Sequence, residues 1–465
     1  MSEMNIQDIV KGGDERISLN KNGLNKYHGN PLIYEGVFNR GSCTMSNLNV
    51  DSKRAVDNMI DRLKVEDYDK LLHDQQKQLK KLILRNSKYD FDVFYGPSGS
   101  DLCYFPIMFS RIMNPEKPIF SIVTCPEELG TGSNTAILGK YFFGTNQFEE
   151  NVVKGGPIHP EVQIAQQAFP ARDDEGNILN HKTDILDVID QKSKTHQVIA
   201  NLVIGSKSGI VDNISMIPRA NPDVFWVIDV CQMRTTAKLI NSLIRLNCMV
   251  LLTGSKFYQS PPFCGAVLVP KTISSKLTNI TDQAVEPFKT IFSTSDIPVE
   301  HPVLRSKFRE NKNYGTLLRW ECAISEMKLL SFYGEDMVTT AIDRWNAFVI
   351  SQLQLNSDYF DLMPDQSITN RSIISFNVKH PDGSLLSDEE LRVLYMEICA
   401  KERDDLDNYK KIIIGQPVKY ENMSFIRLAL GSFNVRRLIA SDFNFSCDKK
   451  LIQIIIKELK KQYWS

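Results

Sequence analysis

Short apolar runs alternate with longer helical patterns through the middle of the chain. The runs cover residues 91–95, 119–124, 198–204, 224–228, 249–253 and 266–269. They are rich in Val, Ile and Phe and apolar on both faces, which is typical of parallel strands buried between two layers of helices. The pattern predicts an α/β domain with a mainly parallel sheet.

The segments on either side have different patterns. Residues 1–50 are rich in Asn, Gly and Ser and predict an irregular N-terminal arm, whereas residues 52–84 have helical periodicity. A polar stretch, 272–300, predicts a loop or crossover, and a helix is expected at 316–332. Beyond it, strands are expected at 372–378, 411–414 and 423–430, with helices at 388–402 and 448–463. We therefore expect an arm (1–50), a large domain (51–345) and a smaller α+β domain (346–465).

Composition narrows the function classes. The 465 residues include 55 Lys and Arg against 56 Asp and Glu, a balance that gives no reason to expect nucleic-acid or membrane binding. No apolar run approaches the roughly 18 residues of a membrane span, and the N-terminus lacks the apolar core of a signal peptide. Nine scattered cysteines without a CxxC pair predict reduced thiols in a cytoplasmic protein. The seven histidines have no ligand spacing, so no metal site is expected.

Two neighbouring apolar runs end in polar residues that carry chemistry. The first delivers Asp229 and then Gln232; the second delivers Thr253, Ser255 and Lys256. Ligands of open α/β sheets sit at the carboxyl ends of the strands, where these side chains would lie. A carboxylate and a lysine there meet the needs of pyridoxal phosphate, whose aldehyde condenses with an amine and whose ring nitrogen is held protonated. Taken singly, Asp229 also fits a helix N-cap, and Lys256 a solvated surface lysine.

A turn with small residues follows the strand at 91–95. Ser98, Gly99 and Ser100 stand between that strand and a helix expected at 102–113. Backbone N–H groups at a helix start can approach a phosphate, and the helix dipole favours an anion there. The same residues also suit an ordinary tight turn between strand and helix.

Together these motifs resemble the fold-type I pyridoxal phosphate enzymes, within them the class V aminotransferase and cysteine desulfurase group. That group carries an Asp, a Gln three residues later and a Ser-x-His-Lys motif about 25 residues further on; Asp229, Gln232, Ser255 and Lys256 stand at matching spacing. The resemblance covers roughly residues 40–435. It implies a three-layer large domain, a smaller α+β domain and pyridoxal 5'-phosphate as cofactor.

The resemblance also implies roles for individual residues. Lys256 would form the Schiff base, Asp229 would pair with the ring nitrogen, and Gln232 would bond the phenolic oxygen. Phosphate contacts fall on Ser98, Gly99, Ser100, Thr253 and Ser255, and on Thr316, which in the group reaches a neighbouring subunit and so implies a homodimer with shared sites. Arg427 would grip the substrate carboxylate, for which a bidentate guanidinium is suited; a partner for a buried acid is its alternative reading. Ser42 and Thr44 would line the mouth of the site.

Three departures from the group's pattern bear on the reaction. The group places a ring over the cofactor after the strand that here ends at Thr124, but this chain offers Glu127 and Glu128. Glu128 would then be an added acid or base, or an ordinary loop acid. An Asn is replaced by Gly205-Ser206, so Ser206 would have to substitute for it. The C-terminal segment lacks the mobile cysteine of the desulfurases, and Cys399 lies in an apolar helical pattern, which argues against desulfuration.

The expected function is that of a pyridoxal phosphate enzyme acting on an amino acid or amine. Transamination is the leading reading because it is the commonest activity of the group. A lyase that eliminates or cleaves at Cβ is the alternative, favoured by the missing ring and by Glu127 and Glu128. A non-catalytic α/β binding protein is a third reading, against which the intact set of Asp229, Gln232 and Lys256 argues. A nucleotide site at 96–101 lacks the Gly-Lys-Ser/Thr ending of a P-loop.

Overall fold

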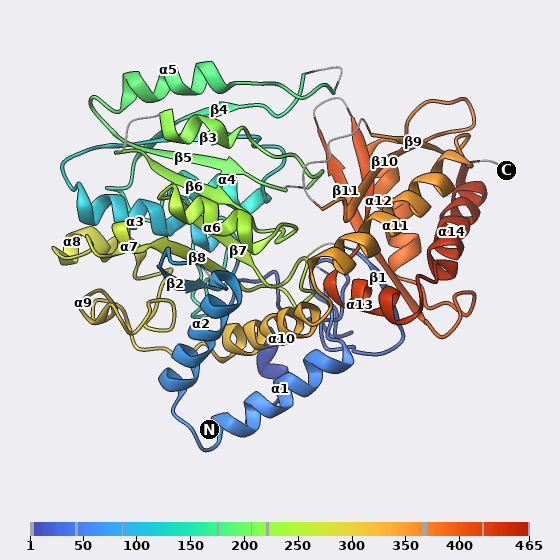
Figure 1. The fold of residues 1–465 in the computed structure, drawn as a ribbon, viewed down its shortest axis with the longest axis horizontal. Helices are drawn as coiled ribbons and strands as arrows, with labels where there is room; N and C mark the ends of the chain where they lie inside the picture. Colours follow the sequence, from blue (N-terminus) through green and yellow to red (C-terminus); the bar gives the residue numbers. More distant parts are fainter. Residues whose placement is uncertain are drawn as a thin grey trace.

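Two β-sheets organise the chain, one in each lobe of the computed structural model (Figure 1). The structure describes residues 4–41, 45–85, 87–173, 176–205, 207–219, 223–363, 370–420 and 423–463. The larger lobe holds a seven-stranded sheet in the order β2-β8-β7-β6-β5-β3-β4. Its strands are β2 (Phe91–Gly96), β3 (Ile119–Thr124), β4 (Ile164–Phe169), β5 (Gln197–Val203), β6 (Phe225–Asp229), β7 (Met249–Thr253) and β8 (Gly265–Pro270).

The large sheet is parallel except for β8, which runs antiparallel to both β2 and β7. The predicted mainly parallel sheet is therefore confirmed, and all six expected strands are present. β4 was not expected. It is one of the two edge strands, and its four central residues are exposed, so it lacks the apolar run of a buried strand.

Alternate side chains of the strands pack into two separate hydrophobic cores, one on each face of the sheet. In β6, Trp226 and Ile228 belong to one core, and Phe225 and Val227 to the other. The first face is covered by α1 (Val50–Leu63), α2 (Tyr68–Leu84), α5 (Lys182–Lys192), α6 (Ala237–Arg245) and α10 (Tyr314–Ser331). The second is covered by α3 (Tyr104–Met113), α4 (Thr131–Ile137), α7 (Lys271–Ser274), α8 (Asp282–Val285) and α9 (Pro302–Arg305). This is the three-layer architecture that the sequence predicts.

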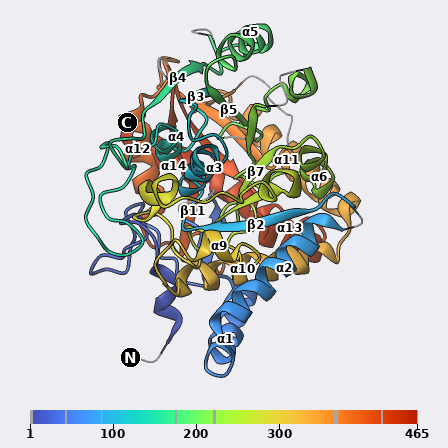
Figure 2. The ribbon, with the colours of Figure 1, turned by 90° about the vertical axis from the view of Figure 1, so that its left-hand side faces the viewer.

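The helices on the first face show how local sequence sets their ends. The periodic stretch expected at 52–84 forms two helices, because the side chain of Asp67 accepts from the N–H of Lys70 and starts α2. α2 and α10 lie side by side below β2 (Figure 2). Trp320 of α10 stacks on Tyr95 of β2 with ring centroids 5.3 Å apart, and its Nε1 donates to the carbonyl of Gly265 at 3.1 Å.

The smaller lobe holds a five-stranded sheet in the order β1-β11-β12-β10-β9. Its strands are β1 (Val37–Arg40), β9 (Phe360–Leu362), β10 (Ile373–Val378), β11 (Lys411–Lys419) and β12 (Ser424–Ala429). Its helices are α11 (Glu335–Gln354), α12 (Asp388–Cys399), α13 (Ser432–Ala440) and α14 (Ser446–Tyr463). The mixture of strands and helices is the α+β pattern expected for the C-terminal part.

The N-terminal arm contributes a strand to this second sheet. β1 pairs in parallel with β11, more than 370 residues away, although the arm reads as irregular in sequence. Its last residue, Arg40, is 3% exposed and forms a bidentate ion pair with Asp448 of α14 at 2.7 and 2.9 Å. A strand of four residues that includes a buried charged side chain shows no apolar pattern long enough to predict it from the sequence. The rest of the arm includes the short helix η1 (Ile6–Val10).

Contacts between the lobes fix the region where they meet. Arg234, which follows β6 and is 1% exposed, donates to Ser372 Oγ at 2.6 Å and to the carbonyl of Leu430 at 2.7 Å. Arg436 of α13 pairs with Glu326 of α10 at 2.7 Å. Within the described residues, no helix combines the length and apolar character that a membrane span requires.

Candidate active site

A cavity of about 510 Å³ lies at the carboxyl ends of the large sheet, where the smaller lobe closes over it. The segments that follow β2, β3, β5, β6 and β7 all reach it, as expected for a ligand site in an open α/β sheet. The predicted site residues among its lining are Ser98, Gly99, Ser100, Glu128, Asp229, Gln232, Thr253, Ser255, Lys256 and Arg427. The structure thus gathers in one cavity residues that are more than 300 positions apart.

Asp229 is the last residue of β6 and is held by the backbone that follows it. The N–H of Cys231 donates to Asp229 Oδ1 at 2.8 Å, which fixes the carboxylate in a tight turn at the strand end. Burial raises the pKa of the Cys231 thiol well above its usual range; Asp229 raises it further, and Lys256 acts in the opposite direction. The charges of Asp229 and Lys256 therefore both act on the buried thiol of Cys231. Gln232 continues this turn and is buried.

Lys256 stands three residues beyond the end of β7, and β7 is the strand next to β6. Thr253 Oγ1 donates to the carbonyl of Cys231 at 2.8 Å, so the two strand ends are tied together. Ser255 is 1% exposed and its Oγ is buried without a hydrogen-bond partner in the described chain. An unpartnered hydroxyl costs about 1–3 kcal/mol, so a group that fills the cavity and bonds this oxygen gains by doing so.

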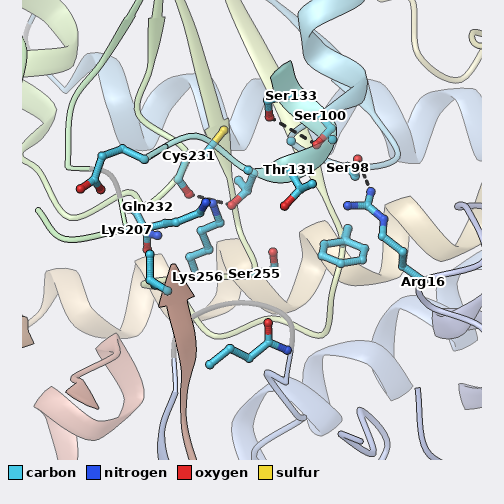
Figure 3. A pocket seen from close by; sticks show the side chains of 18 of the residues that line it. Arg16, Ser98, Ser100, Thr131, Ser133, Lys207, Cys231, Gln232, Ser255 and Lys256 are labelled. Carbon is cyan, nitrogen blue, oxygen red and sulfur yellow. Dashed lines mark hydrogen bonds between the residues drawn. The ribbon is translucent and has the colours of Figure 1, made fainter. Parts of the chain in front are cut away.

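The turn at 98–100 packs directly against these two strand ends. A Cβ added at Gly99 would lie 2.9 Å from Thr253 Cγ2 and 3.2 Å from Cys231 Sγ, so only glycine fits there. Ser100 Oγ and Ser133 Oγ of α4 are 3.3 Å apart. Figure 3 shows Ser98, Ser100 and Ser133 along one side of the cavity, with Lys256, Gln232 and Lys207 along the other.

Glu128 lies in the segment after β3 and is 2% exposed. Its carboxylate accepts hydrogen bonds from the N–H of Ser208 at 2.8 Å, from Ser208 Oγ and from Tyr420 Oη. Ser208 follows β5 and Tyr420 follows β11, so one carboxylate holds three segments from both lobes. This arrangement suits a positioning role. The acid or base role expected from the sequence stays a prediction.

We expect Glu128→Gln to lower the free energy of unfolding by about 1–3 kcal/mol, because an NH2 group would replace one of the two accepting oxygens and face a donor there. Urea denaturation measures the change. Glu150→Gln is the matched control: Glu150 pairs with Arg309 on the surface, where such pairs contribute about 0–1 kcal/mol. A Glu128→Gln protein as stable as the wild type would contradict the positioning role.

Arg427 of β12 reaches the cavity from the smaller lobe and is 5% exposed. Its Nη1 donates to the carbonyl of Lys207 at 3.1 Å, and its Nη2 to that of Gln416 at 3.4 Å. Both of these acceptors are backbone carbonyls, and the bonds to them orient the guanidinium. Lys207, whose Nζ donates to the carbonyl of Glu127 at 2.9 Å, also lines the cavity.

The remaining predicted residues lie elsewhere. Thr316 does not line the cavity: it lies in the first turn of α10, is 3% exposed, and its Oγ1 accepts from Arg319 Nη2 at 3.2 Å. Its role toward a neighbouring subunit stays a prediction. Ser42, Thr44 and Ser206 lie outside the described residues. The described side chains form no cluster of three or more His, Cys, Asp and Glu residues suited to a metal.

Several lining residues were not singled out from the sequence. Arg16, Tyr27, Phe142, Phe263 and the run Thr131, Gly132 and Ser133 all face the cavity. Thr131 and Ser133 come soon after the end of β3, and this position after a buried strand could have marked them as candidate site residues. Arg16 comes from the arm, and the rings from loops without periodicity, so no pattern marks them.

The fold is similar to those of several solved structures. The ureidoglycine–glyoxylate aminotransferase of Bacillus subtilis is 11% identical, with 93% of this chain and 94% of that chain covered at a TM-score of 0.55. The phosphoserine aminotransferase of Cytophaga hutchinsonii is 14% identical (88% and 98% covered, TM-score 0.53), and the alanine–glyoxylate aminotransferase of a Nostoc species 12% identical (90% and 96%, TM-score 0.54). No protein-family model matches the sequence, and no curated protein does.

At these identities the likeness concerns the fold. The match spans nearly the whole of each chain, so both lobes and their order are shared. The fold-type I architecture that the motifs predict is thereby confirmed. What the cavity binds has to be argued from this chain's own residues.

Proposed function

We propose that the chain is a pyridoxal phosphate-dependent enzyme that acts on an amino acid through Lys256, and that it is an aminotransferase. The observation that carries the proposal is the meeting of Lys256 and Asp229 in one cavity with the turn formed by Ser98, Gly99 and Ser100. An amine, a carboxylate and a phosphate-binding turn are the three elements that this cofactor requires of a protein.

The residues present fit the cofactor. Ser255 Oγ is a buried hydroxyl without a hydrogen-bond partner in the described chain, and a phosphate oxygen would accept its hydrogen bond. Gly99 lets the turn pack closely against Thr253 and Cys231, and the helical segment that begins at Asp101 presents its N-terminal end to an anion. Thr253, tied to the Cys231 carbonyl, keeps the turn and the lysine strand at a fixed separation.

Each charged residue then has a distinct task. When bound, pyridoxal phosphate supplies an aldehyde that condenses with an amine and a ring that takes up the electron pair of a bond broken at Cα. Lys256 Nζ would form the covalent link and, once released, carry the proton removed from the substrate Cα. Asp229, oriented by the N–H of Cys231, would keep a proton on the ring nitrogen. Gln232, on the same turn, would bond the phenolic oxygen.

The substrate end of the cavity supports an amino acid. Arg427 brings a guanidinium to the cavity from the smaller lobe, and a carboxylate is the usual partner of a guanidinium in a ligand site. The neighbours in fold that are named as aminotransferases support transfer of an amino group as the reaction. The lyase alternative drew on Glu128 as an added acid or base, and the three donors around that carboxylate weaken its support.

We also propose a homodimer in the cytoplasm, on the resemblance and the composition described above. The partner would be a second copy of this chain. Light scattering of the purified protein measures the mass of the particle directly, and a monomer would contradict the proposal.

The proposed reaction is tested by following nitrogen. The protein, supplied with pyridoxal phosphate, is incubated with ¹⁵N-labelled amino acids and a keto acid acceptor, and the products are read by mass spectrometry. We expect label in the acceptor only when both substrates are present. Release of labelled ammonia without an acceptor would indicate a lyase instead. A protein that takes up no pyridoxal phosphate would overturn the proposal as a whole.

A further inference from the structure

The N-terminal arm is anchored at several points just before the residue that enters the cavity. Arg319 of α10 is fully buried and donates from Nη1 to the carbonyls of Ile9 at 2.6 Å and Lys11 at 2.8 Å. Further along the arm, the carboxylate of Glu15 accepts from the N–H of Gly144 at 3.1 Å and from that of Thr145 at 3.1 Å. The arm at residues 9–15 is therefore fixed to the large domain of the same chain.

Arg16, the next residue, presents a guanidinium to the cavity. Its Nε and Nη2 donate to the two carboxylate oxygens of Asp14 at 2.6 and 2.7 Å, and Nη2 also donates to Ser98 Oγ at 3.1 Å. The guanidinium carbon lies 4.4 Å from the ring centroid of Phe263 and 4.8 Å from that of Phe142. The side chain is 16% exposed, so it is held in one orientation by a carboxylate, a hydroxyl and two rings.

This set of bonds uses only part of the donor capacity of Arg16. A guanidinium has five N–H groups, and the bonds to Asp14 and Ser98 come from Nε and Nη2 alone. Nη1 makes no hydrogen bond with the described residues and is accessible rather than buried, and Arg16 lines the cavity. Asp14 thus orients the cation and leaves one nitrogen for an anion.

A second, independent feature lies on the same wall. Ser255 Oγ is buried and without a partner, and Figure 3 shows Ser255 between Arg16 and Lys256. Below the turn, Ser98 Oγ donates to Asp101 Oδ2 at 2.7 Å, so the oxygen of Ser98 accepts from Arg16 and donates inward. Burial, with Asp14 nearby, raises the pKa of Asp101 to about 7, which reduces the negative charge beneath the turn.

We propose that Arg16 is a ligand of the cofactor phosphate, so that the arm completes the anion end of the site within one chain. The inference rests on the proposed function and adds a residue to it. Nη1 of Arg16 would bond the phosphate from the arm side, Ser255 Oγ from the lysine side, and the Gly99 backbone from the turn. The same arm covers the start of α10: a Cβ at Gly315 would lie 2.0 Å from the carbonyl oxygen of Lys11.

The test compares two cofactor forms that differ only in the phosphate. Apo-protein is titrated with pyridoxal phosphate and with pyridoxal, and the dissociation constants are read from protein fluorescence. We expect Arg16→Gln to weaken pyridoxal phosphate binding by about tenfold to a hundredfold, in keeping with the loss of a hydrogen bond to a charged group. Binding of pyridoxal should stay unchanged, and Arg16→Lys should restore part of the difference.

Arg309→Gln is the matched control, because Arg309 also pairs with a carboxylate, that of Glu150, and lies over a ring, that of Phe148, away from the cavity. It should bind both forms like the wild type. Equal weakening of both forms by Arg16→Gln would show that Arg16 only holds the arm, and no weakening of either would exclude it from the site. Both results overturn the inference while the proposed function stands. A wild-type protein that binds neither form would overturn both.

Discussion

Replacement of Lys256 by alanine is expected to lower kcat by about 10⁴-fold or more, because one side chain supplies both the covalent link and the proton carrier. Lys256 is a cavity amine that stands three residues beyond β7, the strand that pairs with β6 and its terminal Asp229. The methyl group of alanine can do neither task. Amino-group transfer is measured by mass spectrometry in saturating pyridoxal phosphate, so that weakened cofactor binding does not account for the loss.

Lys154→Ala serves as the control for this prediction. Lys154 also lines the cavity but is exposed at its rim, on a segment that follows none of the strands bearing the motif. We expect this variant to turn over close to the wild-type rate. If Lys256→Ala retained a rate comparable with that of Lys154→Ala, the amine at position 256 would not be the reactive group.

Asp229→Asn is expected to lower kcat by about 10²–10³-fold while the cofactor remains bound. The amide keeps the oxygen that accepts from the N–H of Cys231, so the turn after β6 should hold its shape. It loses the negative charge that stabilises a proton on the ring nitrogen, and with it the ability of the ring to take up electrons. Rates and cofactor absorbance measured on one sample separate loss of activity from loss of cofactor.

Asp187→Asn is the control. Asp187 is exposed on α5, away from the cavity, so the same change of a carboxylate to an amide should leave the rate unchanged there. An Asp229→Asn protein with wild-type activity would mean that the carboxylate does not face the ring nitrogen. That result would also remove the reason for placing the cofactor beside β6.

The sheet could be predicted because its strands are buried on both faces. In β6 and β7 every side chain but Asp229 is buried, and the runs are apolar throughout. A uniformly apolar run does not indicate in which direction its strand runs in the sheet. β8 is as apolar as its neighbours, yet it runs antiparallel to them. β4 and β1 escaped detection for opposite reasons, the first because its middle is exposed, the second because four residues gain their stability from a distant strand.

The site residues likewise fall into those that the sequence predicts and those that it does not. Asp229 and Lys256 were predictable because the first ends a buried strand and the second comes three residues after the end of the neighbouring one, so sequence order alone places them at one edge of the sheet. Arg16 was not, since its bond to Ser98 joins residues 82 positions apart and the arm has no periodicity. Glu128 was found as a departure from a motif, but the hydrogen bonds that hold it come from Ser208 and from Tyr420 in the other lobe.

The central claim is that Lys256 is covalently joined to pyridoxal phosphate, and peptide mapping tests it most directly. The holoprotein is reduced with borohydride, digested and analysed by mass spectrometry. We predict a pyridoxyl adduct on the peptide that contains Lys256 and on none of the peptides that carry Lys26, Lys154, Lys207 or Lys419, the other lysines that line the cavity. An adduct on one of those lysines, or an unmodified Lys256 in a protein loaded with the cofactor, would contradict the account.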